Sequence, residues 1–123
     1  MKLHLDRSAV RFLITGYGPD HVLVNGVRHE TSLIILPDEL VADWPGNWSS
    51  LSSPDFDAVA LRAPEILLLG TGPSQRFPAP AVYRHLIAAR IGVEIMNTPA
   101  ACRTYNILAG EGRRVAAALL LNP

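Results

Sequence analysis

The chain has 123 residues, of which 49% are hydrophobic and 18% are charged. This length suits one domain with its own core, and this composition excludes a wholly disordered chain. Eleven basic residues balance eleven acidic ones, so no strong overall charge attracts nucleic acid, and we expect no nucleic-acid partner.

The distribution of cysteine and of apolar residues bears on location. The chain has a single cysteine, Cys102, which cannot form an internal disulfide and suits a reducing compartment. The N-terminus lacks the continuous apolar core of a signal peptide. The longest apolar run, residues 115–121, is far too short to cross a membrane. We therefore expect a cytoplasmic protein that does not insert into a membrane.

The first part of the chain predicts β-structure followed by a less regular segment. Leu3 and Leu5 alternate with polar residues, and residues 16–20 are rich in turn formers. The pair Asn25-Gly26 is a strong signal for a two-residue hairpin turn. We predict strands at residues 3–6, 12–15, 21–24, 27–30 and 31–36, then a loop through residue 54 and a short helix from Asp55 to residue 62.

The second half predicts alternating strands and helices. Residues 66–69 form an apolar run typical of a strand covered on both faces. A helix is predicted at residues 80–91, with Val82, Tyr83, Leu86, Ile87 and Ile91 on one stripe. A strand follows at 93–96, then a helix with Thr98 as N-cap and Pro99 in its first turn, ending at Gly110. Residues 115–121 favour a strand, although the alanines there also suit a helix.

This order of elements predicts a fold class. Alternating strands and helices indicate a mixed, mostly parallel sheet with helices packed on it, and the hairpin adds an antiparallel portion. We predict a single α/β domain over residues 1–123.

Two loops follow parallel strands of the predicted sheet. Because such loops lie at the same edge of a sheet, we expect their side chains to converge on one cleft. The free amides at the start of the helix after Asn97 would favour an anion there. The other interpretation is that the glycines allow a tight strand exit and Thr98 only caps the helix. The candidate ligand-binding residues are Gly70, Thr71, Gly72, Ser74, Gln75, Arg76, Asn97 and Thr98.

The familiar cofactor motifs are incomplete. Gly70 and Gly72 begin like a dinucleotide-binding fingerprint, but Gln75 stands where the third glycine belongs. The only lysine is Lys2, so no phosphate-binding Gly-rich loop with a lysine is present. We expect no cofactor.

Individual reactive residues have structural interpretations. Cys102 lies near the start of a helix, where a thiol pKa falls, but also on its apolar stripe, which favours a buried core thiol. His4, His21, His29 and His85 show no metal-ligand spacing, although His21 and His29 could be cross-strand neighbours and His85 should face outward. Asp55 and Asp57 suit helix capping better than a cation. No carboxylate arrangement for acid–base chemistry stands out, so we expect neither a metal site nor a catalytic residue.

The last helix has a polar strip that offers a candidate surface for a protein partner. Its other interpretation is a solvated helix face, with an Arg103–Glu111 pair of little energetic value. The residues of this strip and of the loop after it are Arg103, Asn106, Glu111 and Arg113.

Several of these motifs resemble a known family. They are Gly70-Thr71-Gly72, Met96-Asn97-Thr98, Ala101, residues 104–108 (Thr-Tyr-Asn-Ile-Leu) and residues 111–115 (Glu-Gly-Arg-Arg-Val). The chain resembles the small domains related to mitochondrial complex I assembly factor 3 and the adipogenesis-associated domain protein. The resemblance implies a single α/β domain of largely unassigned activity, with no agreed catalytic residues. Its mitochondrial members help to assemble complex I through partner proteins, whereas this chain looks bacterial and shows no transit peptide.

These observations lead to two functional hypotheses. The first is a non-catalytic binding or assembly module that acts through a protein partner. The alternative is a small anionic ligand-binding protein or enzyme with a cleft at the carboxyl edge of the sheet.

Overall fold

A computed structural model describes residues 10–121 of the chain. The strand predicted around Leu3 and Leu5, and His4 with it, lie outside the described residues. Within the described part, two sheets and three α-helices form a single α/β domain, which confirms the predicted fold class.

The first sheet is a three-stranded antiparallel meander of β1 (Ile14–Gly18), β2 (His21–Val24) and β3 (Val27–His29). Asn25 and Gly26 have positive φ angles of 50° and 81°, as a tight two-residue hairpin requires. The predicted hairpin is therefore confirmed. The turn predicted at residues 16–20 is shorter than expected, because Gly16 and Gly18 pair with β2 and leave Pro19 and Asp20 to turn.

The second sheet has five strands in the order β5-β4-β8-β6-β7. Its strands are β4 (Leu33–Ile35), β5 (Leu40–Val41), β6 (Ile66–Gly70), β7 (Gly92–Met96) and β8 (Val115–Leu119). The central strand β6 is parallel to both β7 and β8, whereas β4 is antiparallel to β8 and to β5. Residues 115–119 thus form a strand rather than a helix, because burial between two layers outweighs the helix propensity of alanine.

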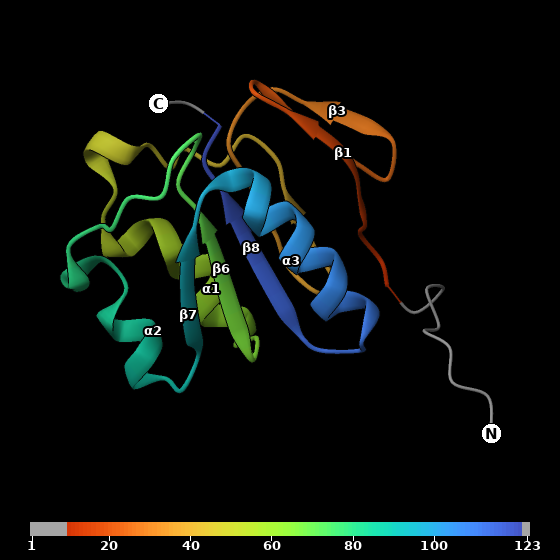
Figure 1. Ribbon diagram of the computed structural model, residues 1–123. Helices are drawn as coiled ribbons and strands as arrows, with labels where there is room; N and C mark the ends of the chain where they lie inside the picture. The colour runs from red at the N-terminus through yellow and green to blue at the C-terminus, as the bar shows by residue number, and fades with distance from the viewer. Residues whose placement is uncertain (1–9, 122–123) are drawn as a thin grey trace.

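The elements pack in layers on the two faces of the five-stranded sheet (Figure 1). Helix α3 (Thr98–Gly110) lies on one face, and the three-stranded sheet lies beside it. Helices α1 (Asp57–Arg62) and α2 (Arg84–Ala88) pack in the other apolar cluster, with the 3-10 turns η2 (Trp48–Ser50), η3 (Ser53–Phe56) and η4 (Pro80–Val82) along the connections. Alternate side chains of β6 enter the two clusters: Leu68 on the α3 side, Leu67 and Leu69 on the other.

The single helix predicted at residues 80–91 is wrong in its extent. The structure has the 3-10 turn η4 and the short helix α2, separated at Tyr83, whose φ of −123° is not helical. The break rotates the predicted stripe, so that Leu86 is buried but Ile87 is 55% exposed. His85 does not face outward as predicted, because both its ring nitrogens are buried without a hydrogen-bond partner among the described residues.

Candidate functional site

The loops after β6 and β7 meet at the carboxyl edge of the five-stranded sheet. The Gly72 N–H donates to Thr98 Oγ1, and the Thr98 N–H donates to the Gly72 carbonyl, both at 2.8 Å. The Thr71 N–H donates to the Met96 carbonyl at 2.8 Å. The prediction that these two loops face each other is confirmed.

Thr98 joins a third segment to these loops. Its hydroxyl donates to the Leu120 carbonyl at 2.8 Å, just after β8 ends. Close packing makes this possible, because a Cβ on Gly70 would lie 2.9 Å from Thr98 Oγ1 and 3.0 Å from its Cα. Thr98 is therefore a buried bridge between the ends of two strands and the start of α3.

The predicted N-cap role of Thr98 is wrong. The cap is Asn97, whose extended backbone lets its Oδ1 accept the Ala100 N–H at 2.8 Å. Thr98 is already the first helical residue, and its side chain turns into the sheet edge.

The amides at this helix start are not free, in contrast to the expectation on which the predicted anion site depends. The Thr98 N–H is bonded to Gly72, and Pro99 has no N–H. The Ala100 N–H is taken by the Asn97 side chain, and the Ala101 N–H by the Asn97 carbonyl at 3.0 Å. No donor of the first turn is left to point at a ligand, so the mechanism proposed for anion binding loses its basis.

The remaining polar residues of the first loop hold the loop itself together. Thr71 Oγ1 is buried and donates to the Ser74 carbonyl at 2.7 Å. Arg76 donates from Nη2 to the Thr71 carbonyl at 2.7 Å, and its guanidinium carbon lies 4.3 Å from the centre of the Trp48 ring. Gln75 Nε2 donates to the Ile95 carbonyl at 3.0 Å on the outer strand β7. These predicted ligand residues thus make internal contacts, and the Ser74 side chain is exposed.

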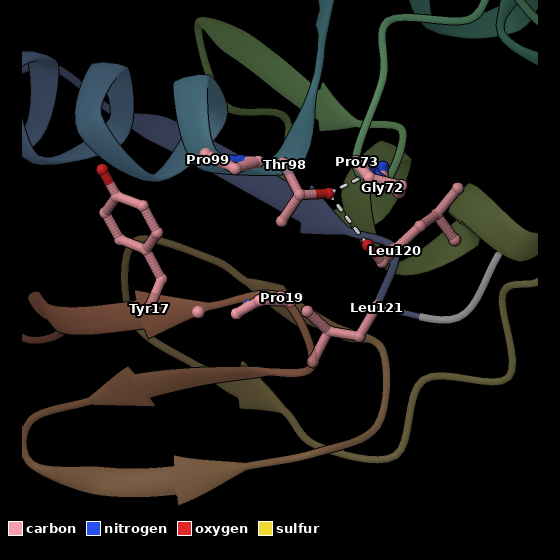
Figure 2. A pocket seen from close by; sticks show the side chains of 9 residues that line it. Tyr17, Pro19, Gly72, Pro73, Thr98, Pro99, Leu120 and Leu121 are labelled. Carbon is pink, nitrogen blue, oxygen red and sulfur yellow. Dashed lines mark hydrogen bonds between the residues drawn. The ribbon is translucent and has the colours of Figure 1, made fainter.

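A pocket of about 340 Å³ opens beside this junction, between the two sheets. Figure 2 shows Tyr17, Pro19 and Leu121 on one side of it and Thr98, Pro99, Gly72 and Pro73 on the other. Gly18 and Leu120 complete the lining. Among residues 10–121, no charged side chain lines the pocket, and the hydroxyl of Thr98 is already engaged in two hydrogen bonds. The site therefore suits an apolar group.

Only Gly72 and Thr98 of the predicted ligand-binding residues line this pocket. The sequence analysis missed the walls made by Tyr17, Pro19, Leu120 and Leu121. The sequence predicts a turn at residues 16–20, but no pattern in it indicates that this turn lies against the end of β8. The contact arises from the docking of one sheet beside the other.

The four residues predicted to form a partner surface do not lie together on one surface. Asn106 is used internally, because its Oδ1 accepts the Ile14 N–H at 2.9 Å and its Nδ2 donates to the Ile14 carbonyl at 2.7 Å. Arg103 is exposed and donates from Nη1 to the Tyr17 hydroxyl at 2.9 Å. Glu111 is exposed, and Arg113 lies 3.4 Å from Glu65 rather than beside Arg103. Of the four residues, Arg103 is the one in contact with the pocket lining.

The most nucleophilic side chain of the chain lies in the core. Cys102 is fully buried on the inner face of α3, and this burial raises the pKa of its thiol to about 12. The core position predicted for it is confirmed. Burial also raises the pKa of Tyr105 to about 12, and the Tyr105 hydroxyl donates to the Phe12 carbonyl at 2.7 Å.

The histidines and paired aspartates have structural partners or positions. His21 lies 2.9 Å from Asp20, and it is Val22 rather than His21 that pairs with His29 across the hairpin. The Asp55 carboxylate accepts the Ser52 N–H at 2.9 Å at the start of η3, and Asp57 begins α1. Within residues 10–121, no group of three His, Cys, Asp or Glu side chains is arranged to hold a metal ion.

Comparison with known proteins identifies the family. Residues 14–120 match the family described as "Protein of unknown function (DUF498/DUF598)", and the chain belongs to that family. It is 32% identical over 118 residues to the bovine (Bos taurus) protein named "NADH dehydrogenase [ubiquinone] 1 alpha subcomplex assembly factor 3". That match covers 94% of this chain but 64% of the bovine protein, so the chain spans less than two thirds of this relative.

Solved structures share the fold. A crystal structure of a Bordetella parapertussis protein has a TM-score of 0.82 and 43% sequence identity, and the match covers 89% of this chain and 94% of that one. A solution structure from Bordetella pertussis, described as a Mth938-like domain, has a TM-score of 0.81 and 35% identity over 99% of this chain and 93% of that one. Within the described residues, no helix is both long and apolar enough to cross a membrane.

Proposed function

We propose that this member of the DUF498/DUF598 family is a non-catalytic binding or assembly module that receives an apolar segment of a protein partner. The observation that carries the proposal is the open apolar pocket at the carboxyl edge of the five-stranded sheet. In open α/β sheets this edge is where ligands are usually bound. An apolar pocket with few polar groups gains its binding energy by removing apolar surface from water.

The chemistry around the pocket favours binding over catalysis. The part of the lining that lies within residues 10–121 offers proline rings, leucine side chains and the Tyr17 ring, but no charged group. Cys102, the strongest candidate nucleophile, is buried, and this burial raises its pKa, so the reactive thiolate is even rarer than in a free cysteine. The Thr98 N–H donates to Gly72, the Ala100 N–H to Asn97 and the Thr98 hydroxyl to Leu120. The alternative of a small anionic ligand therefore has no donors at the start of α3.

The relatives support the involvement of a protein partner. The bovine relative is named as an assembly factor for a subcomplex of NADH dehydrogenase, and an assembly factor acts by contact with other proteins. Because the chain spans 64% of that relative, the role is carried over as part of this proposal. A cytoplasmic location belongs to the proposal as well, and the single, unpaired thiol of Cys102 is compatible with it.

The proposal is tested by affinity capture from the organism that makes the protein, with two matched variants. Leu121→Asp places a carboxylate at the pocket wall, whereas Leu61→Asp places one on α1, where Leu61 is 76% exposed and away from the pocket. We expect a stoichiometric partner with the wild type and with Leu61→Asp, and at least a tenfold lower yield with Leu121→Asp at equal folded protein. A partner retained equally by both variants would place the interaction elsewhere and overturn the proposal.

A further inference from the structure

One end of the pocket carries unused hydrogen-bond donors. Tyr17, which lines the pocket, accepts a hydrogen bond from Arg103 Nη1 at 2.9 Å through its phenolic oxygen. Its own O–H has no acceptor among residues 10–121, and it can therefore donate to a group that enters the pocket. The guanidinium behind it is exposed and keeps further N–H donors and a full positive charge.

The charged residue beside Pro19 in the hairpin turn is the acidic Asp20. Asp20, next to the lining residue Pro19, lies 2.9 Å from His21 Nδ1 and 3.7 Å from Arg28 Nη2. These neighbours use its carboxylate within the first sheet. The surroundings of the pocket are thus cationic at Tyr17, where Arg103 lies, whereas the charge of Asp20 beyond Pro19 is paired within the first sheet.

The middle of the pocket offers an occupant no comparable polar contact. Thr98 Oγ1 accepts from Gly72 and donates to Leu120, and its neighbours in the lining are proline and leucine side chains (Figure 2). A polar group placed there would lose its contacts with water without gaining new ones. An occupant is therefore apolar in its body and polar at the end that reaches Tyr17.

We infer that the pocket selects, from a protein partner, an apolar side chain that has a carboxylate next to it in the partner's sequence. This inference rests on the proposed function and adds the chemistry of the partner segment. The apolar side chain lies between the proline and leucine walls. The carboxylate accepts from the Tyr17 O–H and faces the Arg103 guanidinium, a charge-assisted contact with a preference for an anion.

The test uses three capped dipeptides with the same apolar residue: leucyl-glutamate, leucyl-glutamine and leucyl-lysine. Each is titrated into isotope-labelled protein, and binding is followed by the amide resonances of pocket residues such as Gly72, Thr98 and Leu121. We expect leucyl-glutamate to bind about three- to fivefold more tightly than leucyl-glutamine, as for a solvent-accessible ion pair, and leucyl-lysine to bind most weakly.

Variants separate the charged contact from the rest of the site. Tyr17→Phe and Arg103→Gln should each bring the three dipeptides within about twofold of one another. The control Arg113→Gln, whose side chain lies by Glu65 at the other edge of the sheet, should leave the preference unchanged.

The outcomes distinguish this inference from the proposed function. If all three dipeptides shift the pocket resonances equally, the carboxylate preference is overturned while partner binding in the pocket stands. If no dipeptide shifts them, the inference is overturned, and affinity capture with Leu121→Asp decides the proposed function separately. Hexanoate is added as a fourth probe. If it bound more tightly than leucyl-glutamate, the inference that the carboxylate belongs to a protein partner would be overturned.

Discussion

Replacing Thr98 by valine removes the hydroxyl that joins three segments while it preserves the shape of the side chain. In the native protein this hydroxyl accepts the Gly72 N–H and donates to the Leu120 carbonyl, each at 2.8 Å. The substitution leaves both backbone groups without a partner. A buried polar group that loses its partner costs about 1–3 kcal/mol.

We therefore expect Thr98→Val to lower the free energy of unfolding by about 2–6 kcal/mol for the two groups together. For a domain of this size, the melting temperature should fall by about 10 °C. The quantity is measured by urea unfolding followed by circular dichroism. The hydroxyl-retaining variant Thr98→Ser should recover part of the loss.

Two controls place this effect at the junction rather than in the helix. Thr104 lies on the same helix, and its hydroxyl has no hydrogen bond among residues 10–121, so Thr104→Val should change stability by less than about 0.5 kcal/mol. Asn97→Ala removes the true N-cap and should cost about 1 kcal/mol. A loss below about 1 kcal/mol for Thr98→Val would refute the bridging role derived from its two bonds.

Three further predictions follow from the core, the docking of the two sheets and the packing of α3. The folded-state pKa values of Cys102 and Tyr105 are raised from 9.0 and 10.0 to about 12. Their contribution to stability is therefore fully present below about pH 9 and is lost as the pH rises towards 12. Cys102→Ala should flatten this loss of stability in thermal melts, and native Cys102 should resist thiol reagents. Asn106→Ala should cost about 2 kcal/mol through the two lost bonds to Ile14 and should speed hydrogen exchange in β1, whereas unchanged exchange there would contradict the docking role. Gly70→Ala should destabilise the protein by about 1–3 kcal/mol because its Cβ would meet Thr98 at 2.9–3.0 Å. Gly92→Ala is the control, because the nearest atom to its Cβ would lie at 3.6 Å. Equal losses of stability in the two variants would show that close packing against Thr98 does not require a glycine at position 70.

The sequence predicts the elements whose pattern is local and strong. The apolar run of β6, the hairpin turn at Asn25 and Gly26 and the helix after Asn97 all follow from short-range chemistry. The meeting of the loops at Gly72 and Thr98 could be predicted because parallel strands end at one edge.

The details that decide the site depend on tertiary contacts. Asn97 and Thr98 are both good N-cap residues, and only the backbone conformation selects Asn97 and turns Thr98 inward. Asn106 has the pattern of a solvated helix face, but the docked strand β1 uses its amide. Tyr17 and Leu121 are far apart in the chain, and no local pattern brings them to one pocket.

The central claim is that a protein partner enters the pocket at the carboxyl edge. It is tested most directly by photo-crosslinking in living cells, with p-benzoylphenylalanine in place of Tyr17 in the pocket wall or in place of the exposed Leu61 on α1. We expect one discrete protein adduct from position 17, strongly reduced when Leu121→Asp is added, and no such adduct from position 61. A discrete adduct from position 61 with none from position 17 would contradict the claim.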